Sequence, residues 1–83
     1  MVQCWLVERD YGSRNLITLV YATPDGEREH RKEIPVTAIR NGAVTVTAAK
    51  AIDETDLTAA ADPDRYRPEI ERLRDEHEPD DTL

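Results

Sequence analysis

The sequence predicts a small α+β domain, in which a mainly antiparallel sheet of three to four strands carries one C-terminal helix packed on a face. Apolar, β-forming runs separated by turn residues occupy the first half of the chain, and apolar residues at helical spacing appear near its end. The length of 83 residues fits one domain. We expect residues 1–78 to form this domain and residues 79–83 to be a flexible acidic tail.

Two apolar segments predict the centre of the sheet. Residues 2–9, VQCWLVER, and residues 15–22, NLITLVYA, are rich in β-forming side chains and flank the turn sequence DYGSRN. Apolar residues occur at both odd and even positions of each segment. This pattern is typical of a strand covered on both faces, or of one that contacts a second subunit.

Residues 23–26, Thr-Pro-Asp-Gly, raise the question whether a glycine beside acidic residues forms a phosphate loop. Such a loop needs several glycines and a following helix, and neither is present. The order proline, aspartate, glycine matches a tight turn, so we expect a hairpin that leads into a third strand at residues 28–35. That strand alternates charges and ends at Pro35, which is typical of a solvent-exposed sheet edge.

The following segments are less regular. Residues 36–42 predict a connection that ends in an Asn-Gly turn, and residues 43–48, AVTVTA, alternate as a fourth strand does. Residues 49–61 fit both a strand phase and a helical spacing. We expect an irregular segment there, with at most a helical turn.

A helix is predicted to follow Asp62, a capping residue, and to end at Glu78-Pro79. Pro63 suits the first helical position. The apolar stripe of this helix consists of Tyr66, Ile70 and Leu73. Proline inside a helix removes a backbone hydrogen bond. Pro68 therefore leaves two interpretations open: the regular helix starts there, or Pro68 kinks a longer one.

The net charge of −7 is unevenly distributed. Residues 1–50 carry seven basic and six acidic side chains, a net of +1, whereas residues 51–83 carry four and twelve, a net of −8. Arginine supplies nine of the eleven cations. Carboxylates keep proteins hydrated in molar salt, where a Debye length of about 3 Å screens their repulsion. We interpret the composition as that of a halophilic protein, with an ordinary acidic protein as the alternative.

Four stretches of the chain carry a family resemblance: CWLVERDY, LVYATPDG, TAAKAIDETDL and ERLRDEHEPDD. Together they resemble small uncharacterised proteins of halophilic archaea. The resemblance extends over most of the chain and implies no activity, cofactor or site residue.

No residue is predicted to be catalytic, to bind a cofactor or to ligate a metal. Cys4 lies in an apolar strand without a neighbouring base and is interpreted as a buried small side chain. His30 and His77 lack the spacing of a metal site, and the acidic residues near the C-terminus match no calcium loop. No apolar run approaches the roughly 20 residues of a membrane helix, and the first ten residues are too charged for a signal peptide. We therefore expect a cytoplasmic protein with no membrane contact.

Three hypotheses for the function follow. The first is a non-enzymatic protein-interaction or self-associating module: one helix leaves a sheet face uncovered, which predicts a homodimer through the sheet or a protein partner. The second, less favoured, is RNA or anionic-ligand binding by the basic strand 28–32. Its candidate contacts are Arg28, His30, Arg31 and Lys32. The third, a small enzyme, is the least favoured because no nucleophile or acid–base pair stands out.

Overall fold

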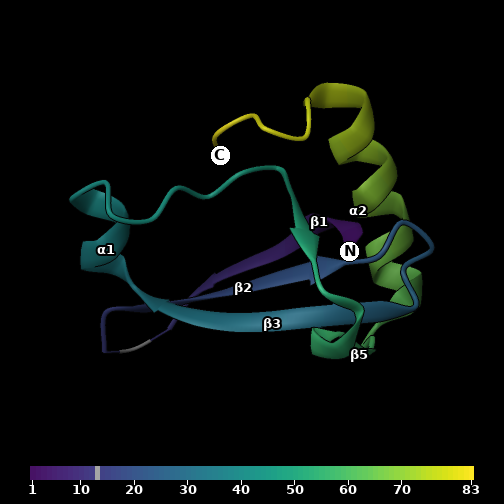
Figure 1. The fold of residues 1–83 in the computed structure, drawn as a ribbon, viewed down its shortest axis with the longest axis horizontal. Helices are drawn as coiled ribbons and strands as arrows, with labels where there is room; N and C mark the ends of the chain where they lie inside the picture. The colour runs from purple at the N-terminus through teal and green to yellow at the C-terminus, as the bar shows by residue number, and fades with distance from the viewer. Residues whose placement is uncertain (13) are drawn as a thin grey trace.

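The computed structural model describes residues 1–12 and 14–83 and has an antiparallel sheet with a long helix on one face (Figure 1). Five strands lie side by side in the order β4-β1-β2-β3-β5. They are β1 (Val2–Tyr11), β2 (Leu16–Ala22), β3 (Arg28–Pro35), β4 (Ala49–Ile52) and β5 (Thr58–Ala59). The predicted α+β class and the antiparallel sheet are confirmed, and the sheet has one strand more than the predicted range allows.

Within the described residues, three helical segments accompany the sheet. They are α1 (Val36–Arg40), the short 3-10 turn η1 (Glu54–Asp56) and α2 (Pro63–Glu76). Helix α2 runs unbroken through Pro68, so the regular helix does not begin there. The Asp62 side chain accepts a hydrogen bond from the backbone N–H of Arg65, which confirms the predicted cap.

A bulge in β1 changes which side chains face α2. Leu6 pairs with Tyr21 and Glu8 pairs with Val20, so Val7 has no partner of its own on β2. Val7 packs in the cluster under α2, and the Glu8 carboxylate reaches an arginine of α2. Both side chains therefore lie on the α2 face, and the alternation that follows places Arg9 on the opposite face.

Both faces of the sheet are covered within one chain. The predicted stripe of α2 is buried on one face, together with strand residues that include Trp5 and Val20. The opposite face has its own buried cluster: Cys4, Leu6, Ile17, Leu19, Tyr21, Ile34, Val46 and Ile52. Side chains of α1, Val44 and Leu57 pack against that cluster. The expectation of an uncovered face is wrong, because irregular segments cover a sheet as well as a helix does. The predicted homodimer thereby loses its premise.

The strand that pairs with β1 begins later than its sequence pattern predicts. Residues 43–48 are irregular chain, with Val46 buried on the sheet, and not the expected fourth strand. The strand itself is β4, which pairs with residues 2–5. The helical turn expected in residues 49–61 is η1, and it lies between β4 and β5. The connection expected at residues 36–42 contains α1.

Residues 79–83 lie beside residues 46–49 and do not extend freely as the predicted tail would. The backbone N–H groups of Ala48 and Ala49 donate to the carbonyls of Asp81 and Pro79, both at 2.9 Å. The Leu83 side chain packs, half-buried, against the clusters on both faces. The acidic composition does not reveal these backbone hydrogen bonds.

The turn at residues 23–26 joins β2 to β3 as predicted. The Gly26 N–H donates to the Thr23 carbonyl at 2.8 Å, and Gly26 has a φ of 75°, which favours glycine. A Cβ atom at Gly26 would lie 2.9 Å from the Arg67 side chain, so the turn also approaches α2 closely. Hydrogen bonds from the Thr23 hydroxyl and the Glu27 N–H lower the pKa of Asp25.

Candidate functional site

The four basic residues predicted as anion contacts do not share one surface. Arg28, His30 and Lys32 lie at alternate positions of β3, on the face opposite α2. The Arg31 side chain lies on the α2 face, 3.6 Å from a carboxylate oxygen of Glu8 and 3.3 Å from one of Glu29. The strand therefore brings three of the four residues together and separates Arg31 from them.

Arg31 belongs to a buried carboxylate network centred on Glu29, a residue that is only 4% exposed. One oxygen, Oε1, accepts hydrogen bonds from the Ala61 N–H at 2.7 Å and from the Tyr66 hydroxyl at 3.0 Å. The other oxygen, Oε2, lies 3.3 Å from Arg31 Nε. The network thus connects β3, the residues before α2 and α2 itself.

This network has a structural role, and we call it a structural tie because its hydrogen bonds hold β3 to α2 and to the residues before α2. Burial raises the pKa of Tyr66, and the hydrogen bond to Glu29 raises it further, so the Tyr66 hydroxyl remains a donor. Both oxygens of the Glu29 carboxylate already have donors, and a general base needs a free lone pair within reach of a substrate proton. The burial of Glu29 leaves no such approach.

Cys4 is buried, and neither Cys4 nor the histidines belong to a metal-binding group in the described residues. Burial raises the pKa of the Cys4 thiol, which is fully buried and lies 3.6 Å from the Val2 carbonyl, so the thiol stays protonated. The interpretation of Cys4 as a buried small side chain is confirmed. In residues 1–12 and 14–83, no group of three histidine, cysteine or acidic side chains could hold a metal ion. None of the helices in these ranges has the length and apolarity needed to cross a membrane.

Strand β1 has a free edge beyond the point where β4 ends. β4 pairs with residues 2–5 of β1, and the Leu6 N–H makes the last bond on that side, to the Ala48 carbonyl at 2.9 Å. No strand of the described chain pairs with the outer side of β1 from residue 7 onward. Edges of this kind are templates for the addition of another strand.

The antiparallel pattern determines which backbone groups face outward on this edge. The Gly12 N–H donates to the Leu16 carbonyl in the β1–β2 hairpin. Hydrogen-bonded positions in an antiparallel pair recur every two residues. Asp10 therefore bonds to β2, whereas the N–H and C=O groups of Arg9 and Tyr11 point away from β2.

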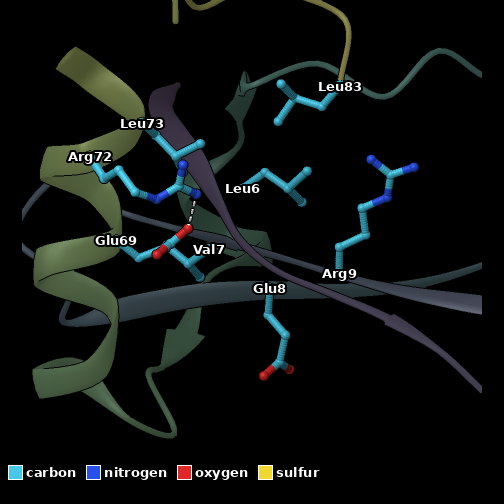
Figure 2. Close-up of a pocket in the computed structure, with 8 residues that line it drawn as sticks. All are labelled: Leu6, Val7, Glu8, Arg9, Glu69, Arg72, Leu73 and Leu83. Atoms are coloured by element: carbon cyan, nitrogen blue, oxygen red, sulfur yellow. Dashed lines mark hydrogen bonds and ion pairs between the residues drawn. The ribbon is translucent and has the colours of Figure 1, made fainter. Parts of the chain in front are cut away.

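A hollow of about 170 Å³ adjoins the free edge (Figure 2). Its lining consists of four consecutive residues of β1, three of α2 and one of the chain end: Leu6, Val7, Glu8, Arg9, Glu69, Arg72, Leu73 and Leu83. Figure 2 shows the three leucines turned toward the same space, with Glu8 pointing away from it. Consecutive strand residues point to alternate faces, so their joint presence places the hollow at the sheet edge.

The volume suits one amino-acid side chain. Pockets for drug-sized ligands span roughly 300–1,000 Å³. A hollow of about 170 Å³ is too small for most cofactors and is large enough for an aliphatic group. A depression of about 400 Å³ lies along Glu71, Arg74 and Asp75. These are exposed side chains of one helix, so that depression is solvent space between them.

The charges along the free edge are neutralised unequally. Glu8 already pairs with two arginines, and Arg72 pairs with two glutamates that raise its pKa. Arg9 and Asp10 have no ion-pair partner among the described residues. The Arg9 guanidinium lies 3.1 Å from the Tyr11 hydroxyl and 5.9 Å from the centre of its ring. One free positive and one free negative charge thus remain at adjacent positions.

The end of the apolar pattern in β1 marks this edge in the sequence. In VQCWLVERDY, the apolar residues at both odd and even positions stop at Val7, and three charged residues follow. The change marks the position where β1 loses the neighbours that bury it. The contributions of α2 and Leu83 have no comparable signal, because they depend on the tertiary fold.

Comparison with known proteins gives a family and no activity. A family model described as "Family of unknown function (DUF7967)" matches residues 1–83. No significant match is found among curated proteins or among solved structures.

Proposed function

The chain belongs to the DUF7967 family, whose description attributes no function, and we propose that it is a non-enzymatic interaction module that binds an extended peptide segment of a protein partner. The observation that carries the proposal is that the free edge of β1 lies directly beside the hollow lined by α2. Backbone groups and a side-chain pocket are the two parts that strand addition requires.

The partner segment would extend the sheet as a further strand. Its backbone would pair with the outward N–H and C=O groups of Arg9 and Tyr11, which provides affinity without dependence on sequence. Alternate side chains of an added strand point to the α2 face. One of them would enter the hollow and contact Leu73 and Leu83.

The other open edge of the sheet is less suited to strand addition. β5 pairs with Arg28 and Glu29, and beyond them β3 exposes Arg31, Lys32 and Glu33. A proline at a strand end has no N–H to donate and so limits strand addition there. Pro35 ends β3, and no residue of β3 lines the hollow beside β1.

Self-association through the β1 edge is opposed by its charges when the pairing is centred on Arg9 or Asp10. A two-fold pairing centred on Arg9 sets Arg9 opposite its own copy, and one centred on Asp10 sets Asp10 opposite its own copy. Like charges directly opposite each other destabilise a strand pair. A partner of different sequence is free of this constraint, which favours a heterologous peptide over a second copy.

RNA or anionic-ligand binding through β3 remains the alternative function. Arg28 and Lys32 have no carboxylate within ion-pair distance in the part of the chain that the structure describes. His30 lies between them, with Nδ1 3.1 Å from the Asp56 carbonyl. Titration with a homopolymeric RNA tests this alternative. Binding that persists in molar KCl and is lost in Arg28→Ala/Lys32→Ala would support it over the peptide proposal.

The cellular setting that we propose is a salt-rich cytoplasm. The support is the net charge of −8 on residues 51–83, which molar salt screens. In such a solvent, backbone hydrogen bonds and apolar contacts retain their strength better than ion pairs do. Strand addition depends mainly on the first two.

An NMR titration tests the peptide proposal. The probe is a heptapeptide with blocked ends, Thr-Thr-Lys-Glu-Val-Thr-Thr, together with variants that replace valine by leucine, isoleucine or alanine. We expect the amide signals of Arg9 and Tyr11 to shift and to gain protection from hydrogen exchange. If millimolar peptide leaves both signals unchanged for every member of the panel, the proposal is wrong.

A pair of proline variants provides the matched control. Arg9→Pro removes one outward donor without removing a bond to β2, and we expect at least tenfold weaker peptide binding. Glu33→Pro makes the same change on the open part of β3 and should leave binding unaltered. Light scattering on the same samples identifies the occupant: a mass twice 9.5 kDa that Arg9→Pro abolishes would show a second copy at this edge instead.

A further inference from the structure

The charges of the free β1 edge define the sequence of its partner more closely. Resting on the proposed function, we infer that the edge selects an antiparallel strand with the order basic–acidic–apolar, read from its N-terminus. This order follows from the register of β1, from the two free charges and from the position of the hollow.

Register determines which partner residue meets which residue of β1. In an antiparallel pair, directly opposite residues have side chains on the same face. The partner residue opposite Arg9 therefore shares the face away from α2, and the residues opposite Asp10 and Glu8 share the α2 face. Both neighbours of β1 within the chain are antiparallel, and the added strand continues that pattern.

The free charges then assign two positions. Arg9 has no carboxylate partner in the described residues, so the residue opposite it is acidic. Asp10 has no cationic partner in the same residues, so the residue opposite it is basic. Opposite charges at facing positions of a strand pair stabilise the pair, and like charges destabilise it.

The third position is apolar. The Glu8 carboxylate lies 2.6 Å from Arg65 and 3.6 Å from Arg31, so its charge is already neutralised. The Glu8 side chain turns inward over the sheet toward these arginines, whereas the partner residue opposite Glu8 lies on the α2 face at the outer edge, where the hollow offers Leu73 and Leu83. An antiparallel partner meets Asp10, Arg9 and Glu8 in that order, which gives basic, acidic, apolar. Beyond Val7 the outer side of β1 is occupied by Ala48 and β4, so the recognised motif ends with the apolar residue.

Two peptides of identical composition test the inference. Thr-Thr-Lys-Glu-Val-Thr-Thr has the inferred order, and Thr-Thr-Glu-Lys-Val-Thr-Thr reverses the two charges. Facing pairs at exposed positions change affinity modestly, and reversing two of them should weaken binding about tenfold. The titrations are made at the lowest KCl concentration that preserves the helical circular dichroism of the protein. The ratio of affinities should shrink as KCl is raised, because the pairs are exposed.

A charge-reversed protein provides the decisive comparison. Arg9→Glu/Asp10→Lys should invert the preference and bind the Glu-Lys-Val peptide about tenfold more tightly than the Lys-Glu-Val peptide. Arg9→Ala should keep the original preference but reduce the ratio of the two affinities. Both positions are exposed, so the variants should keep the dichroism of the parent. Equal affinities for the two peptides, with shifts at Arg9 and Tyr11, would overturn this inference and leave the proposed function standing. An absence of those shifts with both peptides would overturn the inference together with the proposed function.

Discussion

Replacing Tyr66 by phenylalanine should destabilise the chain by about 2 kcal/mol, although only one oxygen atom is removed. The hydroxyl donates to Glu29 Oε1 at 3.0 Å, and the two residues are 1% and 4% exposed. A hydrogen bond to a charged group contributes about 1.5–3 kcal/mol. Glu29 keeps its donors from Ala61 and Arg31 in the variant, so no oxygen is left without a partner, and the lower half of that range applies.

A double-mutant cycle with Glu29→Gln tests the origin of this energy. Glutamine still offers an oxygen to Tyr66 and to the Ala61 N–H, but it carries no charge. In that background Tyr66→Phe should cost about 1 kcal/mol, the value for a neutral hydrogen bond. The predicted coupling is therefore about 1 kcal/mol.

Urea denaturation in molar KCl measures all four proteins. Trp5 is buried in the same cluster as Tyr66 and provides the fluorescence signal. A cost of Tyr66→Phe below about 0.5 kcal/mol in both backgrounds would refute the structural tie. Equal costs of about 2 kcal/mol in both would show that the charge of Glu29 contributes nothing to the bond.

Three further predictions concern other parts of the chain. Gly26→Ala should destabilise at least 1 kcal/mol more than Gly42→Ala in urea, because both glycines have positive φ and only at Gly26 does a Cβ meet other atoms, at 2.9 Å. Dialysis from molar KCl to millimolar buffer should reversibly reduce helical circular dichroism, and Glu71→Gln/Asp75→Asn should reduce that loss; a signal independent of salt would contradict the halophilic interpretation. Burial raises the pKa values of Tyr21 and Tyr66, so the unfolded chain loses these protons first. The pKa of the buried Cys4 thiol is raised as well, so stability should begin to fall near pH 9 and fall further where the tyrosines titrate, above about pH 10. In that upper range the fall should be less steep in Tyr66→Phe, and an identical slope would contradict the burial effect.

The elements that the sequence predicts well are the ones that local interactions determine. The turn at residues 23–26 depends on its own proline, aspartate and glycine, and the α2 cap depends on Asp62 and the N–H of Arg65. The helical stripe is equally local, because its spacing already marks one face. These features need no knowledge of the rest of the fold.

The elements that the sequence mispredicts depend on distant partners. Residues 43–48 have the alternation of a strand, yet they form none. The strand is β4, Ala49–Ile52, because the pairing with residues 2–5 of β1 decides where it forms. Glu29 belongs to a strand that looks uniformly charged, and it is buried because Ala61 and Tyr66 lie over it. The hollow beside the free edge of β1 likewise depends on where α2 and Leu83 lie, which the sequence of β1 does not encode.

The return of β4 to β1 has a consequence for the order of folding. Strands β1, β2 and β3 are joined by short connections, so their pairings close small loops. The pairing of Val2 with Ile52 closes a loop that contains more than half of the chain, and it is therefore expected to form later. A nascent or refolding chain will therefore form the β1–β2–β3 meander first and expose the whole outer side of β1 while it does so. The apolar residues 4–7 are at that stage an open template for intermolecular pairing. Slow arrival of residues 49–52 would reduce the yield of folded protein through aggregation, even in a variant whose native state is as stable as the parent's.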